Sequence, residues 1–373
     1  MSAFAVRAGV SDGTGNTEVR ELPLTTAVSR IRVESSAVCG TDVTLHDHGL
    51  KRPAVLGHHT IGRVDHLTPG DEKALGITVG TRVALEEYVG CGHCAECRSG
   101  RYRLCPAVDL WTGGERVGMI PVDRGSGLHG GNAEYMEISS RHVLHELPDD
   151  LASEMAAWTL PLANGVDWTI HAGGAAPGKT VVVIGPGYHG LSCVAAALAS
   201  GADRVLVVGS TSAASAERLK LAREMGALTE TSDEGTSERI TGALGQVDAV
   251  IDTVGHPSTM ASAVRMLGRS GVLVIAGLSG GDASLDTAAI VRNLITVKGV
   301  RGRSPQAVTK AIELLAGGRT RLDSVPTHRV PLEDIGATLR AMKEGRGPVT
   351  PHIVIDPWLP VESNSELLTG SAK

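Results

Sequence analysis

The chain has 373 residues, which is too long for one small domain and corresponds to two or three domains. Hydrophobic residues make up 42% of the sequence and charged residues 20%, so a fully disordered chain is excluded. The net charge is −6, and the chain therefore has no overall basic field for a nucleic-acid backbone. Aromatic residues are scarce, which argues against stacking platforms for single-stranded nucleic acid and predicts an aliphatic core.

Neither a membrane span nor a secretory signal is predicted. No stretch reaches 18 uninterrupted apolar residues, and residues 1–10 contain no long apolar run and no cleavage-site pattern. We therefore expect a cytoplasmic protein. In that compartment the six cysteines are expected to bind metal or to fill the core instead of forming disulfides.

The first part of the chain, residues 1–165, is predicted to be a β-rich domain with long loops. Short β-branched runs alternate there with Gly, Pro and Asp, which is typical of strands separated by turns. The clearest strand patterns are residues 29–38, 62–67 and 81–89.

Residues 166–300 are predicted to form an α/β domain. Continuous apolar runs, which indicate buried strands, alternate with helical patterns. The predicted strands are 179–185, 203–209, 248–255, 271–277 and 295–300, and the predicted helices are 190–200 and 215–227. This alternation predicts a parallel, doubly wound sheet with right-handed crossovers.

Residues 301–356 form a third zone. A helix is predicted at 306–318, a strand, turn and helix at 328–345, and a last strand at 351–357. The tail, residues 357–373, shows no pattern that would pair with another element and is predicted to be mobile.

A glycine-rich loop follows the first predicted strand of the α/β domain. Gly185, Gly187 and Gly190 form a G-x-G-x-x-G pattern between that strand and a helix. The three glycines permit a tight turn, a close approach of pyrophosphate to the backbone, and close packing of helix on strand. We therefore predict a dinucleotide site that includes Tyr188 and His189, although an ordinary turn with spare glycines remains the alternative.

The end of the second predicted strand favours NADP over NAD. The chain reads Gly209-Ser210-Thr211 where an NAD site usually has a carboxylate for the ribose hydroxyl. The two hydroxyl groups can donate to a 2′-phosphate, and Arg218 and Lys220 add charge if they point inward. The alternatives are NAD, or a plain loop beside a solvated helix face. Gly277, at the end of a later strand, is included in the same cofactor site.

Four cysteines lie close together in the β-rich domain. Cys91, Cys94, Cys97 and Cys105 have the spacing C-x2-C-x2-C-x7-C. Four thiolates within 15 residues are typical of a closed tetrahedral zinc site. Such a site has no open position for a substrate, so we predict a structural zinc in this lobe. Cys193 lies in an apolar helix and is expected to be a core residue.

A second group of metal-binding residue types precedes the lobe. Cys39 stands in a Cys-Gly-Thr-Asp turn, and His58 and His59 follow about twenty residues later. Together with the lobe and the glycine loop, this order resembles the medium-chain dehydrogenase/reductase superfamily, and most closely its zinc-dependent alcohol dehydrogenase branch. The likeness runs from about Ser29 to Asp356 and includes the segment GLHGGNAEYMEI at 127–138.

The resemblance implies a GroES-like catalytic domain, to which residues 301–356 return, and a Rossmann domain. It implies a catalytic zinc held by Cys39 and His58, and a Thr41 side chain that contacts the substrate oxygen and begins a proton relay. It also implies a nicotinamide cofactor in the cleft between the domains. Homodimers or homotetramers are expected by the same resemblance.

The chain departs from the family pattern at several of these positions. His59 stands where the family usually has a glutamate. A further ligand is expected in the segment 158–165, where the alignment gives Leu160 in place of a carboxylate and Asn164 in place of a cysteine. Thr44 replaces a histidine that is often used in the relay. His59 completes a Cys-His-His set if a turn brings both histidines inward; otherwise the zinc is weakly held or absent.

The leading hypothesis is a zinc-containing, NADP-dependent oxidoreductase that transfers a hydride between a nicotinamide cofactor and an alcohol or carbonyl substrate. One alternative is a zinc-independent NADPH reductase of an activated C=C or C=N bond. The other is a nonenzymatic cofactor-binding protein on the same fold. The small-molecule pocket is expected near Thr44 to Leu50, Trp111 and the loops of the Rossmann domain.

Overall fold

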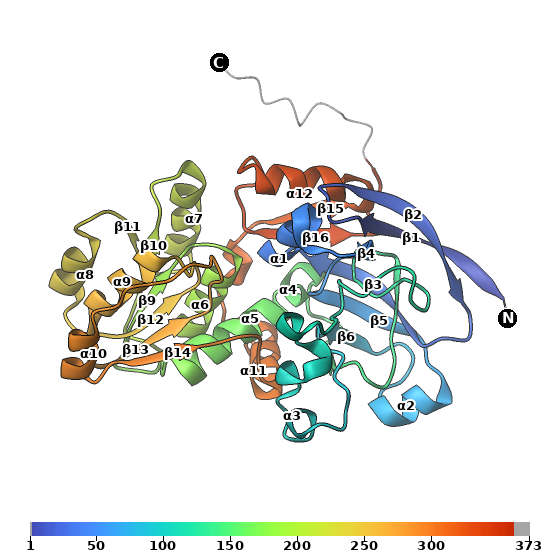
Figure 1. Cartoon of the computed structure of the whole chain (residues 1–373), viewed down its shortest axis with the longest axis horizontal. Helices are drawn as coiled ribbons and strands as arrows, with labels where there is room; N and C mark the ends of the chain where they lie inside the picture. Colours follow the sequence, from blue (N-terminus) through green and yellow to red (C-terminus); the bar gives the residue numbers. More distant parts are fainter. Residues whose placement is uncertain (1, 362–373) are drawn as a thin grey trace, which may run out of the picture.

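The computed structural model describes residues 2–361, so the expectation for the tail beyond residue 361 lies outside the described residues. Two domains lie side by side along the long axis of the molecule (Figure 1). One is built around a parallel sheet from the middle of the chain. The other combines the N-terminal strands with the last two strands of the chain, β15 and β16 (Figure 1).

The α/β domain contains a six-stranded parallel sheet with the order β11-β10-β9-β12-β13-β14. Its strands are β9 (Thr180–Ile184), β10 (Arg204–Gly209), β11 (Leu228–Thr231), β12 (Val247–Asp252), β13 (Leu267–Ile275) and β14 (Thr296–Gly299). This is the order of the doubly wound dinucleotide fold, in which the direction of winding reverses between β9 and β12. The predicted fold class is confirmed, and ligands on such sheets bind beyond the carboxyl ends of the strands at this reversal.

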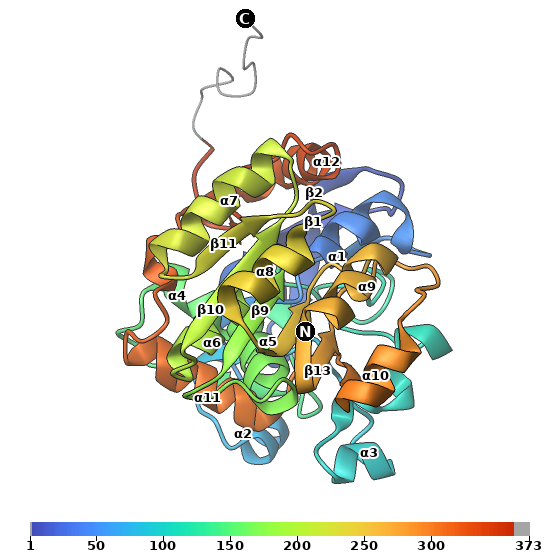
Figure 2. The same cartoon turned by 90° about the vertical axis from the view of Figure 1, so that its left-hand side faces the viewer.

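Helices cover both faces of the parallel sheet, and Figure 2 looks onto this domain from its outer end. They are α6 (Tyr188–Ala199), α7 (Ala213–Glu224), α8 (Thr236–Leu244), α9 (Pro257–Met266) and α10 (Thr287–Asn293). Successive side chains of β9 enter opposite layers, as the period of a strand requires. Val181 and Val183 join the cluster under α6, whereas Val182 and Ile184 join the cluster under α8 and α9.

The β-rich domain contains a larger sheet, ordered β15-β16-β3-β5-β6-β8 with β7 paired to β3, and a smaller sheet, ordered β2-β1-β4. The strands of the larger sheet are β3 (Arg30–Ala37), β5 (Thr60–His66), β6 (Arg82–Leu85), β7 (Tyr135–Glu137), β8 (Leu144–Glu146), β15 (Thr327–Pro331) and β16 (His352–Asp356). Those of the smaller sheet are β1 (Ala3–Ser11), β2 (Thr17–Thr25) and β4 (Ala54–Val55). Because β16 pairs with β3, the C-terminal segment returns to the first domain.

The remaining helices surround the β-rich domain or lie between the domains. They are α1 (Gly40–Thr44), α2 (Pro69–Leu75), α3 (Ala95–Arg98), α4 (Ser153–Ala156), α5 (Thr159–Gly165), α11 (Pro305–Ala316) and α12 (Ile335–Lys343). Helices α5 and α11 lie at the centre of the molecule (Figure 1), and their apolar residues share one core with α6 and β9. No helix among the described residues is long and apolar enough to cross a membrane.

Several predicted elements differ from the structure in their boundaries, and two of these differences affect the site. The helix predicted from Gly190 begins two residues earlier, so Tyr188 and His189 belong to the first turn of α6. The strand predicted at 81–89 ends at Leu85. Beyond it, the backbone N–H of Glu86 donates to the carbonyl of Val143, and the carboxylates of Glu86 and Glu87 have partners outside the strand. Glu86 binds Tyr102 and His145, and Glu87 binds Arg303.

Candidate active site and metal centres

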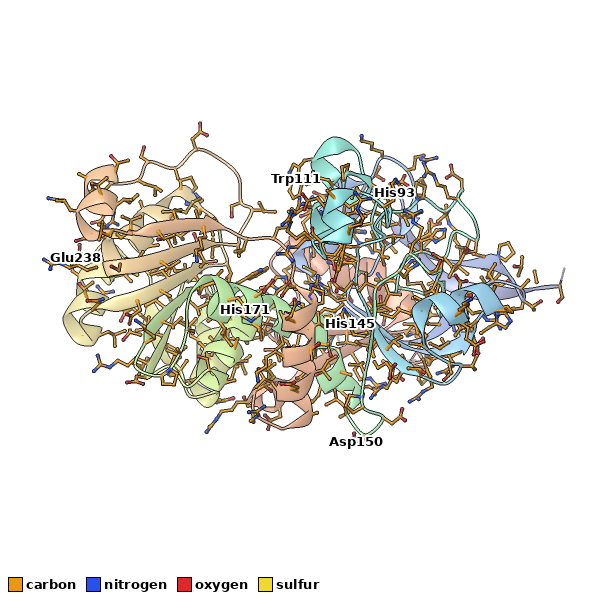
Figure 3. The ribbon with its side chains drawn as sticks, turned by 90° about the horizontal axis from the view of Figure 1, so that it is seen from below. His93, Trp111, His145, Asp150, His171 and Glu238 are labelled. Atoms are coloured by element: carbon orange, nitrogen blue, oxygen red, sulfur yellow. The ribbon has the colours of Figure 1, made fainter. Side chains whose placement is uncertain are left out.

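A cavity of about 370 Å³ is lined by side chains of both domains. The β-rich domain contributes Cys39, Thr41, His58 and His59, and the α/β domain contributes His189, Thr253 and Gly277. The cavity therefore lies between the carboxyl ends of the parallel strands and the metal-binding residue types of the β-rich domain. Leu45 and Trp111, which lie in the stretches expected to form the substrate pocket, line it as well. Figure 3 labels Trp111 on the β-rich domain, beside the segment that carries the four cysteines.

Cys39, His58 and His59 meet at the wall of this cavity. One ligand atom from each of the three lies within 4.8 Å of the other two. Cys39 directly precedes α1, and its backbone N–H donates to Asp42 Oδ2 at 2.9 Å. His58 and His59 lie in the bend before β5, and this bend turns both imidazoles toward Cys39 although they are neighbours in the chain.

Asp42 sets the orientation of His58. Its Oδ1 lies 3.1 Å from Nδ1 of His58, which leaves Nε2 as the nitrogen available on the side of Cys39. A carboxylate behind a ligating histidine is a common means of fixing the tautomer and strengthening the ligand. Sequence analysis gave Asp42 no role. The signal was its position directly after the predicted substrate-contacting Thr41.

The charge states of Cys39 and His59 suit a metal site, whereas His58 must give up a proton when a metal binds. Burial alone would raise the pKa of the Cys39 thiol, but His189 and His58 outweigh burial and lower it to about 5. Burial alone would lower the pKa of His58, but Asp42 and Cys39 hold it well above its ordinary value. Burial and the charge of His58 hold the pKa of His59 well below its ordinary value. A thiolate and a neutral imidazole are the forms in which these residues bind metal.

The other positions at which the chain departs from the family pattern differ in their surroundings. Leu160 is buried in an apolar cluster with Ile61 and Leu147 and offers no donor. Asn164 lines the cavity, and its buried Oδ1 has no hydrogen-bond partner among the described residues. Thr44 is exposed, and its hydroxyl donates to the backbone carbonyl of Gly40 instead of extending a relay.

The glycine loop has the geometry that a bound dinucleotide requires. At Gly185 the backbone φ is +98°, in the region that favours glycine. A Cβ atom at Gly190 would lie 1.8 Å from the carbonyl oxygen of Gly185, so only glycine permits this close packing. A Cβ atom at Gly187 would meet nothing within 4 Å, so the protein leaves the space beside it open. These environments match the three roles of the motif.

The region predicted to bind the 2′-phosphate of NADP has the expected exposed hydroxyls but not the positive charge expected from Arg218 and Lys220. Ser210 and Thr211 are exposed at the end of β10, where they can reach a ligand. Lys220 forms an ion pair with Glu217 on the surface, and Arg218 donates to the backbone carbonyl of Val349. The expectation that these two bases add charge to the site is therefore not supported by their contacts.

Gly209 also has a packing role. A Cβ atom there would lie 2.5 Å from Oγ of Ser215 and 2.9 Å from Leu219 of α7. A side chain at this position therefore requires Ser215 and Leu219 of α7 to shift. The packing of α7 also favours glycine at residue 209, so the missing carboxylate is weaker evidence for NADP than its position alone suggests.

The four cysteines of the lobe converge as predicted. One sulfur atom from each of Cys91, Cys94, Cys97 and Cys105 lies within 4.8 Å of the others. Backbone amides point at three of these sulfurs, which is how turns of the chain stabilise metal-binding thiolates. Backbone hydrogen bonds lower the pKa of Cys91 to about 6, whereas burial and neighbouring sulfurs raise that of Cys97 to about 12.

Arg303 and Glu87 form a buried ion pair that sequence analysis missed. Nη2 of Arg303 lies 2.5 Å from Oε2 of Glu87, and both residues line the cavity. Arg303 follows β14 whereas Glu87 follows β6, so the pair fixes the segment that leaves the parallel sheet to the β-rich domain. No local motif marks it, because the partners are 216 residues apart.

Known proteins with the same organisation were compared with the chain. Residues 27–149 match the alcohol dehydrogenase GroES-like domain, and residues 190–317 match the zinc-binding dehydrogenase domain. A protein named as a probable alcohol dehydrogenase, from Mycobacterium tuberculosis, is 34% identical over 339 residues, covering 88% of this chain and 91% of that protein.

Two solved structures have the same fold over nearly the whole chain. Galactitol-1-phosphate dehydrogenase from Escherichia coli is 26% identical with a TM-score of 0.79, and the match covers 94% of this chain and 100% of that chain. A protein described as a zinc-binding dehydrogenase, from Sinorhizobium meliloti and bound to NADP, is 25% identical with a TM-score of 0.78, covering 95% and 100%. The chain therefore belongs to the zinc-type alcohol dehydrogenase family of oxidoreductases, within the medium-chain dehydrogenase/reductase superfamily.

Proposed function

We propose that this oxidoreductase is a zinc-containing, NADP-dependent dehydrogenase that interconverts an alcohol and a carbonyl compound. The observation that carries the proposal is the convergence of Cys39, His58 and His59 on the wall of the cavity that the glycine loop also approaches. A metal that polarises the substrate oxygen and a cofactor that exchanges the hydride would then meet in one cavity.

The donor set fits zinc. One thiolate and two imidazoles are ligands that zinc accepts readily, and three protein ligands with an open position are the catalytic pattern. Nδ1 of His59 is buried without a hydrogen-bond partner in the described part of the chain. A metal bound by this imidazole would explain a buried nitrogen that has no protein partner. We propose His59 as the third ligand, in the position where the family usually has a carboxylate. Bound there, zinc would supply Lewis acidity toward the substrate oxygen.

The protein's own groups orient the substrate and accept its proton. Oγ1 of Thr41 lies 3.8 Å from Sγ of Cys39 and faces the cavity, within reach of an oxygen held beside the thiolate. The Thr41 hydroxyl is proposed to accept the proton of the substrate alcohol while it donates its own proton to water. Thr41 is exposed, so the proton passes to solvent directly and needs no histidine at residue 44. Leu45 and Trp111 provide apolar surface for the rest of the substrate.

NADP is the proposed cofactor. The hydroxyls of Ser210 and Thr211 are exposed at the end of β10, and no carboxylate at residues 209–211 would repel a 2′-phosphate. The Sinorhizobium meliloti relative, whose structure contains NADP, supports the same choice. NAD is the alternative cofactor, and a smaller dissociation constant for NAD than for NADP would identify it.

The four-cysteine lobe is proposed to hold a second, structural zinc. A zinc ion bound by four sulfurs has no open coordination position for a substrate. None of the four cysteines lines the cavity of the candidate active site. Metal binding at such a site is coupled to folding of the lobe.

Self-association is proposed through the edge of the parallel sheet. β14 is the last strand of that sheet, and Val297 on β14 and the nearby Leu294 are exposed. An exposed edge strand with apolar side chains on it and beside it is a surface on which a second copy of the chain can continue the sheet. The molecular mass in solution tests this.

The proposed activity is tested with purified protein, NADPH or NADH, and a panel of aldehydes and ketones. The proposal predicts carbonyl reduction that prefers NADPH and is lost when a chelator removes one of two zincs. Reduction of activated C=C bonds that persists after this removal would instead identify a zinc-independent reductase. Failure to exchange hydride with any alcohol, carbonyl or activated double bond would contradict catalysis altogether.

A further inference from the structure

His189 belongs to the glycine loop, yet its side chain reaches the metal-binding residues of the other domain. Its Nε2 lies 3.5 Å from Sγ of Cys39, although the two residues are 150 positions apart. The imidazole packs against the rings of Trp168 and His59, with centroids 5.2 and 5.9 Å away. Its Nδ1 is buried and has no hydrogen-bond partner among the described residues.

The separation of Nε2 and Sγ is the one expected for two ligands of a single zinc ion. Zinc–sulfur and zinc–nitrogen bonds of about 2.3 and 2.0–2.1 Å at a tetrahedral angle put the two donor atoms about 3.5 Å apart. His189 thus stands at ligand distance from Cys39, on the side of the cofactor loop. Cys39, His58 and His59 form the compact set of donors. The ring centroid of His189 lies 5.9 Å from that of His59, so His189 joins the set as a fourth donor only if its ring moves toward His59.

The same side chain stands in the path of the cofactor. His189 is the second residue of α6, and the free amides at the start of this helix are where a pyrophosphate binds. The nicotinamide end of the cofactor must then enter the cavity of about 370 Å³ that His189 lines together with Cys39 and Thr253. The ring of His189 and the nicotinamide ring therefore compete for space beside the metal-binding residues.

We propose that His189 is a fourth metal ligand of the cofactor-free enzyme, and that binding of the dinucleotide displaces it. This inference rests on the proposed catalytic zinc. In the exchange, the bond from Nε2 to the metal breaks, and a water or substrate oxygen takes the position. The imidazole leaves as a neutral group, so no proton or electron is transferred. Because the coupling is reciprocal, closing the centre with His189 also weakens cofactor binding.

Cobalt(II) in place of zinc tests the proposal, since its visible absorption reports coordination number and ligand type. Spectra of the unmodified chain and of His189→Ala are recorded without cofactor, during titration with free imidazole. His189→Ala exposes the fourth position, so imidazole should change its spectrum at a concentration at least about 10-fold lower than in the unmodified chain. NADP should change the spectrum of the unmodified chain and make it sensitive to imidazole.

Two further variants give the necessary controls. His189→Phe keeps an aromatic ring against Trp168 but lacks a donor, so its cofactor-free spectrum should differ from that of the unmodified chain even if packing is preserved. His171→Ala removes an exposed histidine whose Nδ1 contacts Asp167, and its spectrum should be unchanged. Figure 3 labels His171 on the α/β side of the molecule. The lobe contributes the same cobalt signal in every variant and cancels in the difference spectra.

The outcomes separate this inference from the proposed function. Two metals per chain, with equal imidazole sensitivity in the unmodified chain and His189→Ala, would overturn the role of His189 and leave the catalytic zinc intact. One metal per chain, confined to the lobe, would overturn both. Two metals per chain with the predicted difference in sensitivity support both.

Discussion

The carboxylate of Asp42 lies 3.1 Å from Nδ1 of His58, and this contact directs the other ring nitrogen toward Cys39. Asp42 also accepts hydrogen bonds from the backbone of Cys39 and Gly57, so one buried side chain positions both segments that carry metal-binding residues. The site is thus held from behind by a residue that does not itself face the cavity.

Asp42→Asn is expected to weaken binding of the second zinc by about 10- to 100-fold, because the ligand loses its carboxylate partner while keeping a similar shape. Competition with a chelator measures this affinity, and the lobe zinc serves as an internal reference. Asp47→Asn alters an aspartate of the same segment that contacts Lys343, and it should have no effect. Unchanged zinc affinity in Asp42→Asn would show that Asp42 does not support the centre.

Gly187 and Gly190 are expected to respond in opposite ways to the same substitution. Gly187→Ala should fold with unchanged stability, since its Cβ meets open space, but it should bind NADP more weakly because that space belongs to the pyrophosphate. Gly190→Ala should destabilise the fold by about 1–3 kcal/mol or more, because its Cβ would overlap the Gly185 carbonyl. Melting temperatures and NADP dissociation constants separate the effects. Equal behaviour of the two variants would contradict the assigned roles.

Ser210→Asp is expected to shift the cofactor preference from NADP toward NAD by about tenfold or more, corresponding to about 1.4 kcal/mol of repulsion with the 2′-phosphate. Residue 210 is exposed, whereas a side chain at Gly209 would collide with α7. Ser210→Asn controls for shape without charge and should retain the NADP preference. The dissociation constants of NADP and NAD are measured for each protein. Tighter binding of NAD than of NADP by the unmodified chain would refute the proposed preference for NADP.

His352 is expected to make stability depend on pH. It is fully buried against Trp158, with ring centroids 4.1 Å apart, and burial lowers its pKa from the ordinary 6.5 to about 3. Between these values the unfolded chain binds a proton that the folded chain excludes. The stabilisation is therefore complete above pH 6.5 and is lost as the pH falls, by up to about 1.4 kcal/mol per unit.

His352→Phe keeps the stacking on Trp158 but cannot be protonated. The variant should lose less stability than the unmodified chain between pH 6.5 and pH 5, as measured by denaturant unfolding at each pH. Other titrating groups are common to both proteins and cancel in the comparison. Parallel pH profiles would show that His352 is protonated equally in the folded and unfolded chains.

Much of the fold was predictable because its signals are local. The strands of the parallel sheet are short continuous apolar runs, and Gly185, Gly187 and Gly190 mark the turn after the first of them. The cysteines of the lobe lie within 15 residues at a spacing typical of zinc sites, so their convergence was predictable from one short segment. In each of these cases, one short segment contains both the sequence pattern and the structure that the pattern predicts.

The remaining features depend on contacts between distant segments. His189 was expected only to bind cofactor, and its approach to Cys39 follows from how the two domains dock. Arg303 and Glu87 meet for the same reason. Gly209 shows a second limit of sequence analysis, because the missing carboxylate reflects the packing of α7 as much as the cofactor.

The central claim is that His59 completes a catalytic zinc site with Cys39 and His58. Metal content per chain, measured for the unmodified protein and for His59→Ala and Cys105→Ser, tests it most directly. The account predicts two zincs in the unmodified chain. It predicts a lobe zinc only, with little hydride transfer, in His59→Ala, and loss of the lobe zinc with a lower melting temperature in Cys105→Ser. A His59→Ala variant that keeps two zincs and full activity would contradict it.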